Sequence, residues 1–462
     1  MERVFGAETE YAISHLAPEG QKAARRLLLR QMMDIAAREI PSIPAADGRG
    51  LFLSNGGRLD VDLTDHPEYA TPECTTPVEL VRKLRESDAI LSSLAERLTV
   101  ELGGDVMVTK TNVDYASANT WGAHESYAIR RGQEINRNLI SFLCSRVIFT
   151  GSGGWNNLAP GLEFTLSPRV PHLKRIVSTE STHSRGLIHD ASSRGRQVDR
   201  ETDHRIHLTI GESLSSEVAL VLKAGTTALV VALIEASVNP GEGVELAKPL
   251  VAIQAFSRDA SCRQSAEIKG RRRLRAIDIQ RHYLRLAEQQ VGALPVWAGA
   301  VLQLWAQVLD GLEDGSEQQR MRLEWVIRRK VFERYLTSRG FDWSNLPAGH
   351  EKADLFELDN KLGRVGRAGM FPLLDQLGAL NHRIDVTGFP KEPVPTRATV
   401  RGKAIGACFA SGLTDSCRGD WNYILDRKNR MVLDLGDPFE TCLNWRPKAE
   451  TLGFDFHAWG LR

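Results

Sequence analysis

The chain has 462 residues, of which 42% are hydrophobic, and its 59 basic side chains are balanced by 58 acidic ones. This length provides for two or three average domains with a sizeable core. A net charge this close to zero gives no general electrostatic case for a nucleic-acid partner. The apolar runs fall short of membrane-spanning length, so we expect no membrane partner either.

The cysteines and the N-terminus indicate the cellular compartment. The six cysteines are scattered, and none forms a Cys-x-x-Cys pair. Such spacing argues against a structural zinc site or a disulfide framework and favours the reducing cytoplasm. The N-terminus is charged from Glu2 and Arg3 onward, which is unlike a signal peptide. We therefore expect a cytoplasmic protein.

The N-terminal segment, residues 3–11, alternates in the way that a β-strand does. Glu8 and Glu10 share one face with Gly6, whereas the opposite face is largely apolar. Residues 20–39 then predict a helix with one apolar face, and prolines end it.

The most unusual stretch runs from Arg58 to Cys74. It begins as a strand, with Leu59 and Val61 on an apolar face. The opposite face and the residues that follow carry charge, at Arg58, Asp60, Asp62, His66, Glu68 and Glu73. A solvated strand face is the simpler interpretation, but two strands with paired carboxylates favour one shared cation site. Mg²⁺ binds carboxylate and phosphate oxygens, so the two strands predict a magnesium site.

The rest of the chain predicts an α+β fold with a largely antiparallel sheet and helices packed on it. Further strands are expected at residues 106–110, 121–129 and 204–210, and further helices at 77–101, 215–236, 276–291, 295–312 and 318–339. The helix at 215–236 is apolar enough to be central, and Ser213 is its expected N-cap. A proline-rich connector at 390–395 separates a main domain, residues 1–390, from a small C-terminal domain, residues 396–462.

The known phosphate-binding loops are missing from the sequence. It contains no Gly-x-x-x-x-Gly-Lys-Ser/Thr segment, and the glycines at 151–154 lack its lysine and spacing, so they are interpreted as a turn. A nucleotide would therefore bind on a metal-decorated sheet, where Mg²⁺ holds the phosphates and Arg58 and Arg205 neutralise developing charge. A carboxylate that holds no metal could serve as general base.

Several motifs together resemble one family, that of the Pup ligase (proteasome accessory factor A) and its sister, the deamidase or depupylase of Pup. Both are relatives of glutamine synthetase. The resemblance covers nearly the whole chain and rests on Gly6-Ala-Glu-Thr-Glu10, Asn55-Gly-Gly-Arg-Leu59, His66-Pro-Glu-Tyr-Ala-Thr-Pro-Glu-Cys74, Gly122-Ala-His-Glu-Ser-Tyr127, Leu222-Lys-Ala-Gly-Thr-Thr-Ala-Leu-Val230, Ala276-Ile-Asp-Ile-Gln-Arg281, Trp325-Val-Ile-Arg-Arg-Lys330, Thr396-Arg-Ala-Thr-Val-Arg-Gly402, Asp420-Trp421 and Asp437-Pro-Phe439.

The resemblance implies a glutamine-synthetase-like fold and a set of site residues. The matched positions are Glu8 and Glu68 as magnesium ligands, Asp62 as proton acceptor, and Arg58, Thr71 and Trp421 as ATP contacts. Asp60 stands where the family usually has a metal-associated tyrosine, and Glu10 completes the acidic set. Arg205 is expected to steady an acyl phosphate.

The resemblance favours ligation over deamidation. The deamidases carry a long insertion between the first strand and the acidic strand, whereas the interval 12–54 is short here. The spacing from Asp62 to Glu68 is also that of the ligases. The implied activity phosphorylates a terminal glutamate of a small Pup-like protein modifier with ATP and joins it to a lysine of a protein substrate. A deamidase on the same Mg-ATP site is the alternative, and an inert adaptor is disfavoured because the site residues are intact.

Three segments depart from the family pattern or have no assigned role. Residues 189–199 and 359–361 differ from the usual family sequence. The loop at 189–199 could touch the modifier or the acyl phosphate, so either it is rebuilt for a different substrate or the activity has drifted. The basic run 269–275 is either a binding surface for an acidic protein tail or a solvated loop before a helix.

Overall fold

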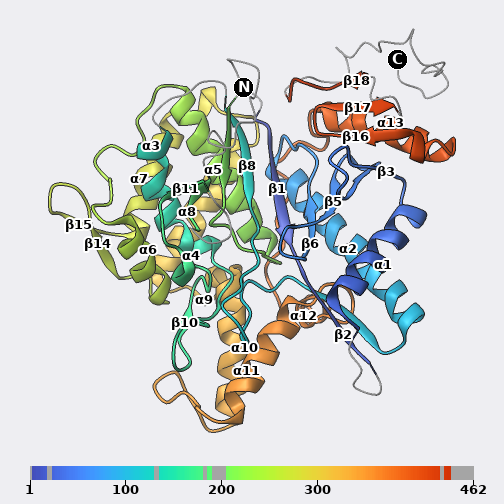
Figure 1. Cartoon of the computed structure of the whole chain (residues 1–462). Coiled ribbons are helices and arrows are strands. Elements are labelled where there is room, and N and C mark those ends of the chain that lie inside the picture. Colours follow the sequence, from blue (N-terminus) through green and yellow to red (C-terminus); the bar gives the residue numbers. More distant parts are fainter. Residues whose placement is uncertain are drawn as a thin grey trace. The chain divides into compact units, whose positions relative to one another are not determined.

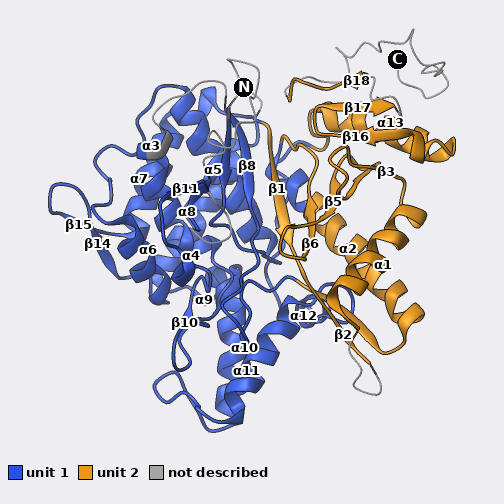
Figure 2. Ribbon diagram, in the orientation of Figure 1, with its two compact units in different colours: residues 1–3, 76–81, 110–390 blue, residues 4–75, 82–109, 391–462 orange. Residues whose placement is uncertain are grey.

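The computed structural model of the protein describes residues 3–17, 23–129, 135–179, 185–189, 204–426 and 431–438. The chain divides into two units, which Figure 2 shows in different colours. Unit 1 comprises residues 1–3, 76–81 and 110–390, and unit 2 comprises residues 4–75, 82–109 and 391–462. The domain boundary expected at the proline-rich connector stays a prediction.

Unit 2 is built on antiparallel strands in the order β1–β6–β5–β4–β3 (Figure 1). Their bounds are Phe5–Glu10 for β1, Pro67–Ala70 for β6, Arg58–Val61 for β5, Leu51–Leu53 for β4 and Ser42–Pro44 for β3. A second ribbon pairs β2 (Ala12–Leu16) with β7 (Asp105–Thr109). Helix α1 (Arg25–Glu39) and most of helix α2 (Pro77–Leu102) belong to the same unit.

The C-terminal segment of unit 2 packs on this sheet. Helix α13 (Arg397–Ala410) contacts β3 and β4, and it is followed by the antiparallel strands β16 (Cys417–Gly419), β17 (Tyr423–Asp426) and β18 (Met431–Asp434). One buried cluster joins these elements and includes Ile43, Phe52, Val400, Ile405, Ile424 and Leu433. Removing this apolar surface from water holds the segment on the sheet.

Unit 1 contains the strand order β11–β12–β13–β8, of which only the pair β11–β12 is parallel. The strands are β8 (Glu125–Ile129), β11 (Val177–Ser178), β12 (Ile188–His189) and β13 (His204–Leu208). Two short hairpins pair β9 (Gly154–Trp155) with β10 (Phe164–Thr165), and β14 (Ser265–Glu267) with β15 (Arg273–Arg275).

The regular elements of unit 1 are mainly helices. They are α3 (Ile135–Ser145), α4 (Val147–Thr150), α5 (Glu217–Glu235), α6 (Pro249–Arg258), α7 (Ala276–Gln289), α8 (Ala298–Asp314), α9 (Glu317–Arg320), α10 (Glu324–Ser338), α11 (His350–Gly363) and α12 (Met370–Gln376). The helix predicted at 318–339 is broken between α9 and α10. Leu323, beside the break, and Trp325, in the first turn of α10, are both completely buried.

Helix α5 is the central helix that its apolar sequence predicts. It is long and apolar enough to cross a membrane by composition, but 94% of its most apolar window is buried inside the protein, as in a core helix. Its N-cap was wrongly assigned to Ser213. The hydroxyl of Ser216 accepts the bond from Ala219 N, because α5 begins at Glu217.

Candidate active site

The predicted carboxylates lie in one row across three neighbouring strands of unit 2. Glu10 of β1 stands directly opposite Glu68 of β6, and Glu68 stands opposite Asp60 of β5. Side chains opposite each other in an antiparallel pair share a face of the sheet. The antiparallel register therefore places three acidic groups side by side on one face of the sheet.

A second row lies two residues along the same face. Ala70 of β6 is paired with Glu8 on one side and with Arg58 on the other. The small side chain of Ala70 thus separates an acidic from a basic residue. Carboxylates in one row and a guanidinium in the next form a suitable floor for a metal ion and phosphate groups.

The electrostatics of the row fit a divalent cation. Burial, followed by the charges of Glu8 and Glu10, raises the pKa of Glu68 well above its usual range. Like charges this close repel each other unless a cation lies between them. Glu10, Asp62 and His66 also each offer one ligand atom within 4.8 Å of the others. The carboxylate oxygens among these donors suit a hard divalent ion such as Mg²⁺, whereas the His66 nitrogen does not.

Arg58 is held in place by two carboxylates and a ring. Its Nη2 donates to Asp60 Oδ2 at 2.5 Å and to Asp47 Oδ2 at 2.9 Å. Its guanidinium carbon lies 5.5 Å from the centre of the Phe52 ring. The side chain is only 14% exposed. Pairing with both carboxylates fixes Arg58 on the face that carries the acidic row.

Asp62 lies at the first position of the turn that joins β5 to β6. Its carboxylate accepts hydrogen bonds from Thr64 N and His66 N, both at 2.8 Å, and from Thr64 Oγ1 at 2.5 Å, and His66 Nδ1 lies 3.2 Å away. Burial alone raises the pKa of Asp62, but the hydrogen bonds from His66 and Thr64 outweigh it and hold the pKa below its usual range. Asp62 is therefore an ionised, oriented carboxylate at neutral pH.

Thr71 and Trp421 approach the same region of unit 2 from different segments. Thr71 is buried, and its Oγ1 accepts a hydrogen bond from Ala7 N at 3.0 Å. The ring of Trp421 meets that of Phe52 edge to face, with centroids 5.1 Å apart. Phe52 therefore contacts both Arg58 and Trp421, which links two of the three expected ATP contacts.

Arg205 belongs to unit 1, where it is exposed on β13 and paired in register with Ala128 of β8. Its expected role in steadying an acyl phosphate stays a prediction. Residues 190–199 of the divergent loop and Phe439 of the last motif lie outside the described residues.

Several residues with contacts in the site escaped the sequence reasoning. They are Asp47, Phe52, Thr64 and Arg401, whereas His66 and Glu73 were noted without their contacts to Asp62 and Arg401. His66 could have been found, because a donor four residues after a carboxylate in a tight turn can bond back to it. Phe52 and Arg401 gave no local signal.

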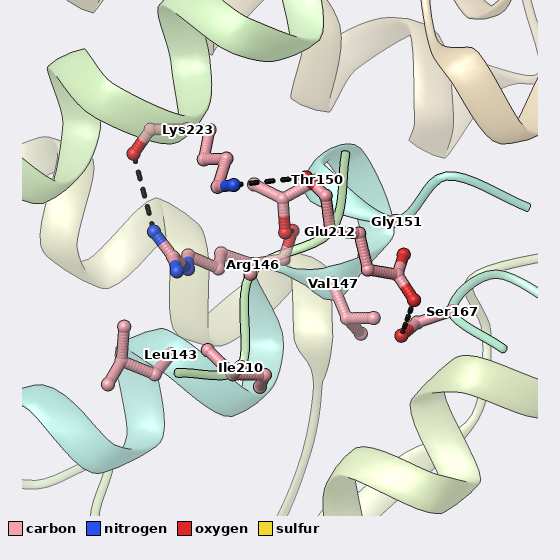
Figure 3. A pocket seen from close by; sticks show the side chains of 10 residues that line it. Leu143, Arg146, Val147, Thr150, Gly151, Ser167, Ile210, Glu212 and Lys223 are labelled. Atoms are coloured by element: carbon pink, nitrogen blue, oxygen red, sulfur yellow. Dashed lines mark hydrogen bonds between the residues drawn. The ribbon is translucent and has the colours of Figure 1, made fainter. Parts of the chain in front are cut away.

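Unit 1 contains a separate buried polar cluster, shown in Figure 3. Arg146 Nη2 bonds to Glu125 Oε1 at 2.7 Å, and Lys223 Nζ donates to the carbonyl of Glu212 at 3.0 Å. Burial lowers the pKa of Lys223 to about 8. The cavity among these side chains has a volume of about 10 Å³, which suits one water molecule at most.

Comparisons with known proteins agree with this arrangement. The family described as "Pup-ligase protein" matches residues 3–425. A Pup–protein ligase of Actinosynnema mirum is 33% identical over 455 residues, which is 95% of this chain and 96% of the relative. One of Rhodococcus jostii is 32% identical over 456 residues, covering 95% of this chain and 97% of the relative.

Two solved structures are similar as well. A crystal structure of the complex between the prokaryotic ubiquitin-like protein Pup and its ligase PafA matches with a TM-score of 0.79 and 26% identity, covering 95% of this chain and 89% of that chain. The Pup ligase PafA in complex with ADP matches with a TM-score of 0.71 and 26% identity, covering 92% of this chain and 91% of that chain.

The fold and these matches together define the class of protein. The largely antiparallel strands with packed helices confirm the glutamine-synthetase-like α+β fold of an ATP-using ligase. More narrowly, the chain belongs to the Pup-ligase family.

Proposed function

We propose that the protein is an ATP-dependent ligase that joins a terminal glutamate of a small Pup-like protein modifier to a lysine of a protein substrate. The observation that carries the proposal is the acidic row Glu10–Glu68–Asp60, which lies beside Arg58 and Asp62. This site occurs in a chain that is similar to Pup–protein ligases over 95% of its length.

The reaction would proceed in two transfers. An oxygen of the modifier's glutamate side chain attacks the γ-phosphorus of ATP, so that an acyl phosphate forms and ADP leaves. The uncharged ε-amine of a lysine then attacks the acyl carbon, an isopeptide bond forms and phosphate leaves. Arg58 is placed to neutralise charge on the transferred group, and Thr71 and Trp421 to contact the nucleotide.

The acidic row would hold magnesium. Glu8, Glu10 and Glu68 are the proposed ligands, and Asp60 can join them where it is not engaged by Arg58. When bound, Mg²⁺ neutralises phosphate oxygens and so favours phosphoryl transfer.

Asp62 would accept the proton of the attacking lysine. A lysine ammonium has no lone pair, so it must lose a proton before it can attack. The ionised state of Asp62 suits an acceptor. Its oxygens already receive bonds from the turn, and the exposed Thr64 hydroxyl is the donor most easily displaced by the incoming amine.

The protein is proposed to act in the cytoplasm. Its free cysteines within the described part of the chain, Cys74, Cys144, Cys262, Cys408 and Cys417, are all buried thiols. Reduced cysteines are typical of a cytoplasmic protein and support this location.

The decisive experiment incubates the purified protein with Mg-ATP and small Pup-like proteins ending in Glu or Gln, with a lysine-bearing substrate present. Intact-mass spectrometry and ADP formation are the readouts. A substrate mass gain equal to the modifier minus water supports the proposal. Ammonia released from a Gln terminus, or modifier released from a conjugate without net ATP use, would instead establish the deamidase alternative.

A further inference from the structure

A buried ion cluster lies directly behind the expected nucleotide contacts. Glu73 follows Thr71 by two residues, and its side chain is 12% exposed. Its Oε2 accepts a hydrogen bond from Arg401 Nη2 at 2.6 Å, and its Oε1 accepts one from Arg397 Nε at 2.6 Å. A fully buried Arg401 is thus neutralised within unit 2.

All five N–H donors of Arg401 are engaged. Two donate to Glu73 and two to the carbonyl of Gly56, and the remaining one donates to the carbonyl of Trp421 at 3.1 Å. The guanidinium carbon also lies 4.9 Å from the centre of the Trp421 ring. Arg401 therefore holds both the backbone and the ring of Trp421.

The three segments that Arg401 joins carry the expected ATP contacts. Gly56 precedes Arg58 by two residues, Glu73 follows Thr71, and Trp421 is itself one of the contacts. The turn at Gly56 also lies against α13, because a Cβ on Gly402 would stand 2.3 Å from the carbonyl oxygen of Ser54. A displacement of Arg401 would thus be felt at all three contacts.

Stability alone explains this cluster poorly. Removing a charged pair from water costs about as much as the pair regains, so buried ion pairs are often replaceable by apolar side chains. The same burial gives a fixed geometry, and a planar guanidinium that bonds three segments fixes their mutual position better than a lysine could. Glu73 remains ionised across the physiological range, because Arg401 and Arg397 together outweigh its burial and lower its pKa to about 2.

We propose that Arg401, held by Glu73, is a positioning residue that orders Trp421 and the adjoining turns for nucleotide binding. This inference rests on the proposed ATP-dependent function. It predicts that Arg401 affects nucleotide affinity more than the rate of the chemical steps.

The test uses the full chain and the variant Arg401→Lys. Because lysine keeps the charge but loses two donors and the stacking plane, we expect the KM for ATP to rise about tenfold while kcat changes little. In fluorotryptophan-labelled protein, the Trp421 resonance, assigned with Trp421→Phe, should shift before nucleotide is added and respond less to ADP. Glu73→Gln should change the KM for ATP and the Trp421 resonance in the same direction as Arg401→Lys. It replaces Arg401→Lys as the test if that variant does not fold.

Arg328→Lys is the matched control. Arg328 of unit 1 is as deeply buried and bonds to Asp359 Oδ1 at 2.7 Å, but it belongs to a different unit from Trp421. The Arg328→Lys variant should lose thermal stability without a change in the KM for ATP or in the Trp421 resonance. The inference is overturned if Arg401→Lys and Glu73→Gln behave like this control. If wild-type protein neither binds ADP nor turns over ATP, the proposed function itself fails, and the inference with it.

Discussion

At the scale of single residues, the turn Asp62–His66 shows how a carboxylate can be prepared for proton transfer. The Asp62 carboxylate is ionised, and its orientation is set by donors from Thr64 and His66. Asp62→Asn keeps the shape but cannot accept a proton, so we expect conjugate formation to fall by about 10²–10⁴-fold while ADP still binds. Intact-mass spectrometry and calorimetry with ADP measure the two effects.

Asp65→Asn is the control for this variant. Asp65 lies in the same turn, but its carboxylate pairs with Arg26 at 3.0 Å on the surface. Near-normal conjugation is expected from it. Wild-type rates with Asp62→Asn would refute the assignment of Asp62.

The ionisation of Glu73 predicts that its contribution to the free energy of unfolding increases with pH. Its folded-state pKa is lowered from 4.5 to about 2, so its ionisation favours the folded state above pH 4.5 and loses this contribution as the pH falls through 2. The contribution is on the order of 3 kcal/mol. The free energy of unfolding should therefore differ most between wild type and Glu73→Gln at neutral pH, and the difference should shrink toward pH 2. Urea unfolding across this range measures it, and a constant difference would contradict the assignment.

At the scale of elements, two serines near the start of helix α5 can be compared as its N-cap. Ser216 Oγ accepts from Ala219 N and donates to the carbonyl of Arg322, whereas Ser213 Oγ is buried without a hydrogen-bond partner among the described residues. Ser216→Ala should cost about 1–2 kcal/mol of unfolding free energy. Ser213→Ala should be neutral or slightly stabilising, because it removes an unsatisfied group. Denaturant unfolding of both variants decides between the two caps, and the reverse order would restore Ser213.

The elements were predictable where the signal is local. The helix expected at 77–101 is observed as Pro77–Leu102, because its apolar face repeats with the helical period. The break between α9 and α10 was missed, because the buried Trp325 at the start of α10 has partners that are distant in sequence, the carbonyl of Ile148 and Gly153.

In the candidate site, too, features with a local sequence signal were predictable, and features that depend on distant residues were not. Alternation placed Glu8 and Glu10 on one face, and the structure agrees. The opposition of Glu10, Glu68 and Asp60 depends on strand register, which the sequence of one strand does not specify. Arg401 and Glu73 lie 328 residues apart, so only the fold brings them together.

At the scale of the whole molecule, a balanced net charge conceals a strongly acidic face. The 59 basic and 58 acidic side chains nearly cancel, but strand register gathers Glu10, Glu68 and Asp60 in one row on β1, β6 and β5, beside the ion pair of Arg58 with Asp60. Global charge therefore gave no case for a nucleic-acid partner and no sign of the acidic row. A metal that binds this row should stabilise the folded chain, because it binds the folded state alone.

Glu68→Gln tests this coupling between site and stability. Glu68 lies between Glu10 and Asp60, so replacing its charge removes repulsion when a chelator is present, and the melting temperature should rise by a few degrees. Added Mg²⁺ should raise the melting temperature of the wild type but much less that of the variant, since a ligand is lost. Glu96→Gln, at an exposed position on α2, should follow the wild type in both conditions. Differential scanning calorimetry with and without Mg²⁺ gives the comparison, and equal Mg²⁺ shifts for Glu68→Gln and wild type would show that the acidic row does not hold the metal.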